Sequence, residues 1–254
     1  MNPLPQAQAA TDGPTAYYRS AEAMRSRSVA ARALSTTLDV PAPPLRLRAD
    51  WERDMAHSLG LEAGDVEPLP LARTRARWPD LRDCVQALAR WTRELGLQDV
   101  LAGSDIALMA CRGAKYHHDA ELYGDKAFCN LFLSEDRGLD LHFPASGQRI
   151  PLVRGTAVLF DTGSPHAVIA RRSAGFQAAD FPAGLDCNQV FLSWELPIEN
   201  MQLAQALGIA FDTDPATARM LEVEQLQLHG APARLCPESG RWCGVDAVSP
   251  TGRL

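Results

Sequence analysis

The sequence has no apolar segment that approaches the roughly 18 consecutive residues needed to cross a bilayer. Its start, Met1 to Gln6, lacks the basic region and apolar core of a secretion signal. Acidic residues (31) outnumber lysine and arginine (25), and the formal net charge is −6, so no broad cationic surface for nucleic acid is expected. We therefore predict a cytoplasmic protein whose partners include neither a membrane nor nucleic acid.

Closely spaced cysteine pairs are also missing, because no Cys-x-x-Cys occurs among the six cysteines. Four of the six lie in apolar segments and are expected to be small buried thiols. Cys236 and Cys243, near the C-terminus, could form a disulfide or bind a metal. A reducing cytoplasm favours free thiols at both positions.

Helical patterns dominate the N-terminal part of the chain. Residues 1–14 are rich in Pro, Gln, Ala and Gly and are predicted to be disordered. Thr15 to Leu38 is interpreted as a helix, and a short helix is expected from Ala49 to about Leu59. Pro79 starts an amphipathic helix that ends at Gly96. We therefore predict a helical extension over residues 15–104 that packs on the core.

This extension is basic against an acidic remainder. The excess of arginine is interpreted as a solvated helix face that packs on the core. The alternative is an arm that docks on an anionic partner. The arginines concerned are Arg25, Arg27, Arg32, Arg46 and Arg48.

Short β-prone segments follow one another over residues 105–196, with turn residues between them. Strands of this length and spacing indicate an antiparallel sandwich or barrel. The predicted fold class is therefore mainly β with flanking helices (α+β). Strands are predicted over 105–111, 127–133, 139–143, 148–153, 155–160 and 188–196.

One segment of this core contains His-x-Asp, as His117 and Asp119. Residues i and i+2 of a strand point to the same side, so both side chains should face the interior and His118 should face outward. The intervening strands would return the chain to deliver His166 to the same place. Two imidazoles and one carboxylate can cover one face of Fe(II) and leave the opposite face open for O2 and an organic ligand.

The order of these motifs resembles that of the Fe(II)/2-oxoglutarate-dependent oxygenases, in particular the prolyl-hydroxylase-like branch. Gly113 precedes His-x-Asp, and an apolar strand from Phe128 to Leu133 follows it. Next come a strand ending in Phe143, then Ile150 to Phe160, and finally His166. The resemblance covers roughly residues 105–196.

This resemblance implies a double-stranded β-helix, or jelly-roll, core with N-terminal and C-terminal helices. It implies Fe(II) held by His117, Asp119 and His166, with 2-oxoglutarate as co-substrate and ascorbate as an in vitro reductant. The implied reaction hydroxylates a C–H bond with O2 and releases succinate and CO2. The expected substrate is a small molecule or is amino acid-like, with a protein side chain as the alternative.

The chain departs from the family at one position. The family places Arg or Lys about ten residues past the distal histidine, where it grips the far carboxylate of 2-oxoglutarate; this chain has Phe176 there. Other residues are therefore proposed to bind the co-substrate, namely Arg171, Arg172, Lys126 and Asn130. Tyr123 and Arg112 are proposed to contact the substrate. The missing cation favours an alternative, a jelly-roll metalloenzyme that does not use 2-oxoglutarate, and a non-catalytic ligand-binding barrel is the third hypothesis.

Residues 197–254 follow the core. Asn200 to Leu207 and Pro215 to Leu228 are interpreted as two helices, because an Asp-Thr-Asp-Pro helix start separates them. The tail from His229 onward is rich in Pro, Gly, Cys and Arg and is expected to be irregular.

Overall fold

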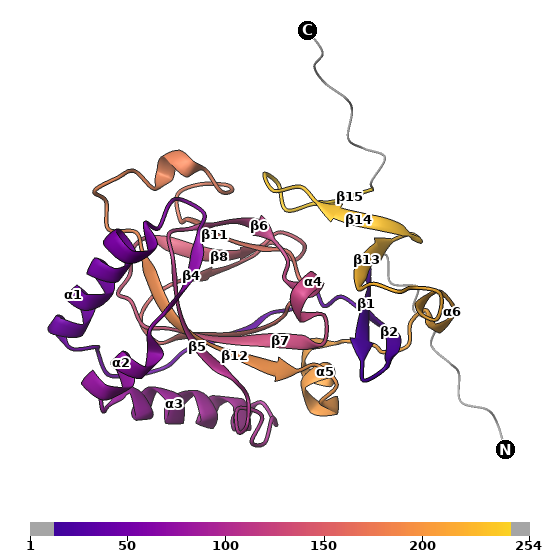
Figure 1. The fold of residues 1–254 in the computed structure, drawn as a ribbon, viewed down its shortest axis with the longest axis horizontal. Helices are drawn as coiled ribbons and strands as arrows, with labels where there is room; N and C mark the ends of the chain where they lie inside the picture. The colour runs from indigo at the N-terminus through magenta and orange to yellow at the C-terminus, as the bar shows by residue number, and fades with distance from the viewer. Residues whose placement is uncertain (1–12, 245–254) are drawn as a thin grey trace, which may run out of the picture.

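The computed structural model describes residues 13–244, which form antiparallel sheets flanked by helices. Two sheets form the body of the molecule and lie opposite each other (Figure 1). The larger sheet has the strand order β3 (Leu34–Thr37), β10 (Thr156–Asp161), β7 (Lys126–Phe132), β12 (Gln189–Pro197), β5 (Ile106–Cys111) and β4 (Val66–Leu69). The smaller sheet has the order β6 (Ala114–His117), β11 (His166–Ala170), β8 (Leu139–Phe143) and β9 (Gln148–Pro151).

The mainly β class with flanking helices is confirmed, and each predicted core strand lies within two residues of an observed one. The His-x-Asp segment was predicted as a strand and forms β6 only as far as His117, whereas the segment of β11 was not predicted as a strand. Both strands are short and contain the histidines of the proposed site.

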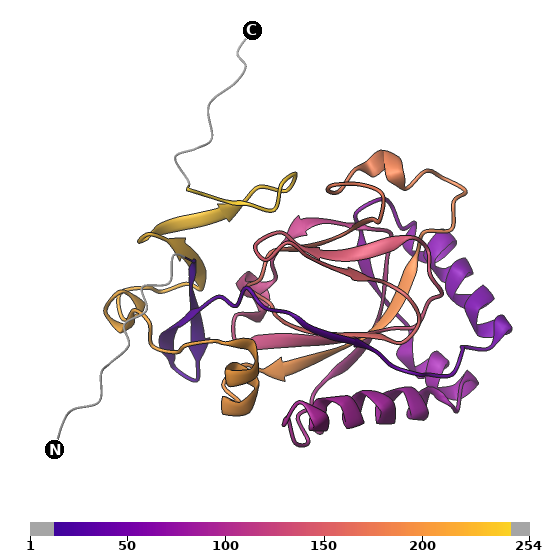
Figure 2. The same ribbon diagram turned by 180° about the vertical axis from the view of Figure 1, so that it is seen from behind.

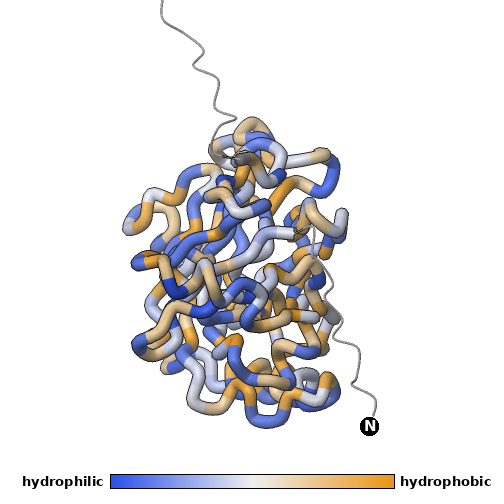
Figure 3. The backbone as a smooth tube through the Cα atoms, turned by 90° about the vertical axis from the view of Figure 1, so that its right-hand side faces the viewer, coloured by the Kyte–Doolittle hydropathy of each residue, from blue (hydrophilic) through white to orange (hydrophobic). Residues whose placement is uncertain are grey.

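The strands of the larger sheet alternate between two cores, as the period of a strand requires. On β12, Leu192, Trp194 and Leu196 belong to a core shared with the helices. Phe191 faces the other way, into the core between the two sheets. Figure 3 shows that hydrophilic and hydrophobic residues are mixed along most of the backbone.

Helices cover the outer face of the larger sheet. α1 (Leu45–Arg53) continues as the π-helix η1 (Asp54–Leu59), followed by α2 (Leu71–Arg77) and α3 (Leu81–Glu94). The predicted helix from Pro79 to Gly96 is confirmed by α3, whose apolar stripe enters the outer core. The helix predicted from Ala49 begins earlier, at Leu45. α5 (Met201–Leu207) is confirmed and is capped by the Asn200 side chain. No helix in the described part of the chain has the length and apolar character needed to span a bilayer.

A third sheet joins the two ends of the described chain. Its order is β15 (Trp242–Gly244), β14 (Ala231–Leu235), β13 (Gln225–Leu228), β1 (Thr15–Ser20) and β2 (Ala23–Ser28). Figure 2 shows this sheet beside the sandwich, at the end away from α1 and α3.

Three local predictions are therefore wrong. Thr15 to Leu38 is not a helix but forms β1, β2 and β3, because strand pairing with distant partners outweighs its helical composition. The helix predicted to Leu228 stops with α6 (Pro215–Ala218), and Gln225–Leu228 is β13. The tail is ordered into β14 and β15 as far as Gly244. The disorder predicted for residues 1–14 falls almost wholly outside the described residues.

Candidate metal centre

Strand pairing brings the two histidines together. His117 is the last residue of β6 and His166 is the first of β11, and the two are direct partners in the antiparallel register. Their ring centroids lie 4.3 Å apart. The pairing of β6 with β11 therefore places these two histidines side by side, although they are distant in the sequence.

Asp119 reaches the same point by another route. β6 ends at His117, so the expectation that His117 and Asp119 share a strand is wrong. The chain turns, and Asp119 precedes the short helix α4 (Ala120–Tyr123). Its backbone N–H donates to the Thr162 carbonyl at 2.7 Å, in the loop before His166. Its carboxylate oxygens lie 3.8 Å from Nε2 of His117 and 3.6 Å from Nε2 of His166.

The turn also changes the place of His118. This residue was expected to face outward, but its ring is half-buried and lies 5.2 Å from the Trp242 ring of β15. His118 lies between the candidate ligands His117 and Asp119 in the sequence, and its ring packs near the third sheet. It is not in the group that can hold a metal.

The hydrogen bonds of both imidazoles leave the same nitrogen available. Nδ1 of His117 lies 2.7 Å from the Lys115 carbonyl, and Nδ1 of His166 lies 2.9 Å from the Ser164 carbonyl. A carbonyl only accepts, so each Nδ1 carries the proton and each Nε2 has a free lone pair. One ligand atom from each of His117, Asp119 and His166 lies within 4.8 Å of the others.

The electrostatics of this group favour a cation. His166 is 6% exposed, and burial together with the neighbouring His117 lowers its pKa well below the ordinary value. Burial raises the pKa of the Asp119 carboxyl. The partly buried Asp119 carboxylate faces one nitrogen of each imidazole, and a divalent ion between the three groups would supply a positive charge there. The donor set of two imidazole nitrogens and a carboxylate suits Fe(II).

Residues 161–164 connect the segments that position the candidate ligands. The Asp161 carboxylate and the Arg27 guanidinium are both 0% exposed and form an ion pair at 2.8 Å. Nε of Arg27 also donates to the Gly124 carbonyl at 3.0 Å, just after α4. The Thr162 hydroxyl donates to the carbonyls of Tyr123 and Lys126. The segments that contain Asp119 and His166 are therefore tied to each other and to β2.

A cavity of about 280 Å³ lies between the two sheets, and the three candidate ligands line it. Its walls are mostly apolar and aromatic. Besides the three candidate ligands and Cys111, the polar lining residues are Tyr123, Asn130, Ser193 and Glu195. The complete apolar lining is Val66, Ala107, Met109, Ala114, Phe128, Phe132, Leu141, Phe160, Val168 and Phe191.

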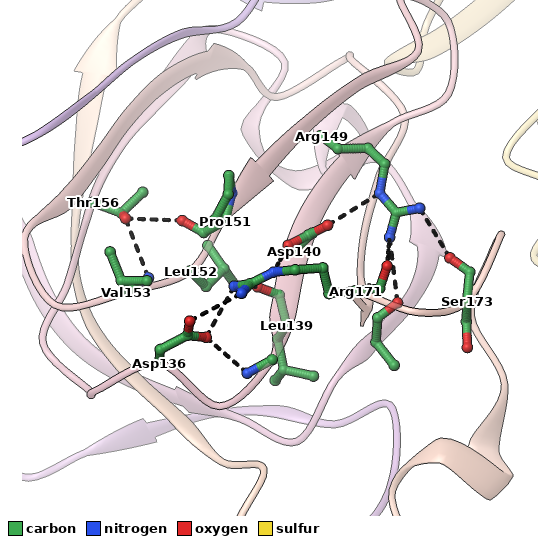
Figure 4. A network of polar contacts seen from close by, with 12 residues as sticks. Asp136, Leu139, Asp140, Arg149, Pro151, Leu152, Val153, Thr156, Arg171 and Ser173 are labelled. Atoms are coloured by element: carbon green, nitrogen blue, oxygen red, sulfur yellow. Dashed lines mark hydrogen bonds and ion pairs between the residues drawn. The ribbon is translucent and has the colours of Figure 1, made fainter.

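Two of the residues proposed from the sequence to bind co-substrate or substrate line this cavity, namely Asn130 and Tyr123. The other four do not. Arg171 donates to Asp136 and to Asp140, with Arg149 on the other oxygen of Asp140 (Figure 4).

The remaining three cations are also engaged outside the cavity. Arg172 pairs with Asp180 at 3.0 Å, and Lys126 pairs with Asp125 at 2.6 Å. Arg112 donates to Asn188 and to the carbonyls of Phe181, Pro182 and Leu185. It therefore fastens the insertion before β12 to the sheet.

Phe176 is at the position where the family has a cation, and its ring stacks on Phe181 with the centroids 5.4 Å apart. Phe181 in turn closes over Gly113, where an added Cβ would lie 2.5 Å from the ring. Phe176 and Phe181 therefore form a packed apolar contact over Gly113.

Ser193 and Glu195 are cavity residues that the sequence analysis missed. They alternate with the core residues Leu192, Trp194 and Leu196, so their polarity within an apolar strand was the available signal. Burial and the nearby Asp105 raise the pKa of Glu195.

No protein-family model and no curated protein matches this chain. Solved structures that match this chain include a prolyl-4-hydroxylase from Pseudomonas putida, which is 18% identical with a TM-score of 0.38 over 65% of this chain and 92% of that one. The viral collagen prolyl hydroxylase from Paramecium Bursaria Chlorella virus-1 is 13% identical with a TM-score of 0.35, over 66% and 90%. The non-heme alpha ketoglutarate dependent epimerase SnoN from nogalamycin biosynthesis is 14% identical with a TM-score of 0.32, over 67% and 83%. At these values the likeness carries no argument about function.

Proposed function

We propose that this chain is a mononuclear non-haem iron oxygenase with a jelly-roll core, which uses a 2-oxo acid and O2 to oxidise a C–H bond of a small molecule. The observation that carries the proposal is the convergence of His117, Asp119 and His166 at the wall of an apolar cavity. Three ligands on one face leave coordination positions for O2 and an organic ligand.

The residues present fit the metal. Both Nε2 atoms are free, and the carbonyls of Lys115 and Ser164 hold the rings in the required tautomer. When bound, the iron supplies the oxidising chemistry. The chain's own residues hold it, orient the ligands and keep water away from the reacting atoms.

The cavity suits a small organic molecule. Its volume of about 280 Å³ is near the lower end of ligand pockets. Phe128, Phe160 and Phe191 exclude water from one side of the ligand, while Asn130 and Ser193 offer polar groups that can orient it. A protein side chain is the alternative substrate, and no feature of the described surface favours it.

2-Oxoglutarate, which the family resemblance implies, fits this cavity only in part. Its keto acid end would bind the metal and needs no further protein charge. Its far carboxylate would need a cation, and no lysine or arginine of residues 13–244 lines the cavity. This same observation favours a second candidate, an iron enzyme that uses no 2-oxo acid.

An anaerobic Fe(II) titration tests the proposal. We expect one Fe(II) per chain and a metal-to-ligand absorption band when a 2-oxo acid is added. His117→Ala and His166→Ala should abolish iron binding, whereas the exposed His57→Ala should leave it unchanged. If the wild-type protein bound no iron, or the His117→Ala protein bound it as well as the wild type, the proposed function would be wrong.

A further inference from the structure

The cavity contains negative groups and no positive one. Among the described residues, its ionisable lining besides the two histidines and Cys111 consists of Asp119, Tyr123 and Glu195. A divalent metal would offset Asp119, whereas Glu195 has its nearest cation, Lys126, in a surface groove and none among the residues that line the cavity. An anionic group placed remote from the metal would therefore meet no partner for its charge.

The polar groups of one cavity wall form a strip of two neutral side chains that ends in the carboxyl group of Glu195. Asn130 and Ser193 are direct partners on β7 and β12, and Glu195 is two residues further along the same face of β12. Asn130 is 7% exposed, and its Oδ1 has no hydrogen-bond partner. This free acceptor would repel the oxygens of a second carboxylate on the ligand.

The nearest candidate cation is Lys126, which is on the same face of β7 as Phe128 and Asn130 but does not line the cavity. Lys126 shares a surface groove with Glu195 and Asp105 and is paired with Asp125 at 2.6 Å. To reach the cavity it would have to leave the Asp125 carboxylate. Phe176, at the family's anchor position, is stacked on Phe181.

We propose that the site takes a 2-oxo acid with an uncharged, mainly apolar tail in place of 2-oxoglutarate. This inference rests on the proposed function, because the keto acid end is held at the metal formed by His117, Asp119 and His166. The aromatic wall then receives the tail by exclusion of water, and no buried carboxylate is left without a counter-charge.

A matched pair of ligands tests the inference with the iron-loaded full chain under anaerobic conditions. The first is 2-oxoglutarate, and the second is 5-methyl-2-oxohexanoate, in which two methyl groups replace the distal carboxylate oxygens. We expect the compound with the uncharged tail, 5-methyl-2-oxohexanoate, to bind about tenfold to a hundredfold more tightly than 2-oxoglutarate, measured from the absorption band. O2 consumption coupled to release of the shortened acid should follow the same order.

Two variants make the test sharper. Glu195→Gln removes the negative charge without changing the shape of the side chain. The affinity ratio of 5-methyl-2-oxohexanoate to 2-oxoglutarate should therefore decrease. Lys126→Met should leave the preference unchanged, because Lys126 lies outside the cavity. A loss of 2-oxoglutarate binding in Lys126→Met would identify Lys126 as the anchor and overturn the inference.

The outcomes separate this inference from the proposed function. Tighter binding of 2-oxoglutarate than of 5-methyl-2-oxohexanoate overturns the inference but does not affect the proposed function. Iron binding with no band from either compound overturns the inference and favours the iron enzyme without a 2-oxo acid. Absence of iron binding overturns the proposed function itself.

Discussion

The buried pair between Arg27 and Asp161 offers the sharpest test of how the metal site is held. We expect Arg27→Met to lower the free energy of unfolding and to weaken iron binding together. Asp161 accepts from Arg27 Nη1 at 2.8 Å, from Ala30 N at 2.8 Å and from Gly163 N at 2.9 Å. Removal of the guanidinium leaves this carboxylate buried with only the two backbone donors.

The size of the effect follows from burial. Breaking a buried ion pair by removing one partner typically costs about 3–5 kcal/mol of unfolding free energy. Arg25, two residues earlier on β2, pairs with Glu199 and Asp212, but these side chains are 33%, 41% and 55% exposed. Exposed pairs contribute about 0–1 kcal/mol, so Arg25→Met is the matched control.

The metal readout distinguishes a positioning role from general stability. Arg27 joins the Gly124 carbonyl to Asp161, and these lie on the segments that contain Asp119 and His166. We expect Arg27→Met to weaken Fe(II) binding about tenfold, as loss of an outer partner of a metal site does. Arg25→Met should bind iron as the wild type does.

Chemical denaturation of Arg27→Met, Asp161→Asn and the double variant completes a double-mutant cycle. Because the double variant removes both charges, it should be less destabilised than the sum of the single variants. The reasoning is refuted if Arg27→Met costs no more than Arg25→Met, or if the two single effects add.

Three further outcomes are expected. Mn(II) at a hundredfold its Kd should raise the free energy of unfolding by about 2.7 kcal/mol, and His166→Ala should show no such gain in a thermal-shift assay. Gly155→Ala should destabilise the protein more than Gly147→Ala in urea unfolding. Both glycines have positive φ (+88° and +70°), but only at Gly155 would the added Cβ lie 2.0 Å from the Leu38 carbonyl oxygen. Equal losses of unfolding free energy would contradict the packing described. Asn200→Ala should cost about 1 kcal/mol of unfolding free energy, because the Asn200 side chain accepts from two backbone N–H groups at the start of α5, and an unchanged midpoint would show that this cap is unimportant.

The sequence by itself predicted the parts whose signal is local. Segments of β-prone residues between turn signals located the core strands to within two residues, and the 3.6-residue period located α3, because each signal lies within one element. The residue types of the candidate metal site could also be recognised in the sequence. His117, Asp119 and His166 were selected by the ligand types that Fe(II) prefers, and the fold brings them together.

Tertiary structure decided whatever depends on distant partners. Within Thr15 to Thr37, β1 and β2 pair as a local hairpin, but β1 also pairs with β13, and β3 pairs with β10, far away in the sequence. Arg27 was interpreted as part of a solvated basic face, yet its partner Asp161 lies 134 residues away and the pair is buried. The charge of the cavity is likewise a property of how strands face one another. Arg112, Lys126 and Arg171 are close to the site in sequence, but whether a side chain enters a cavity depends on the side of the sheet and the partners available there, which only the folded chain determines.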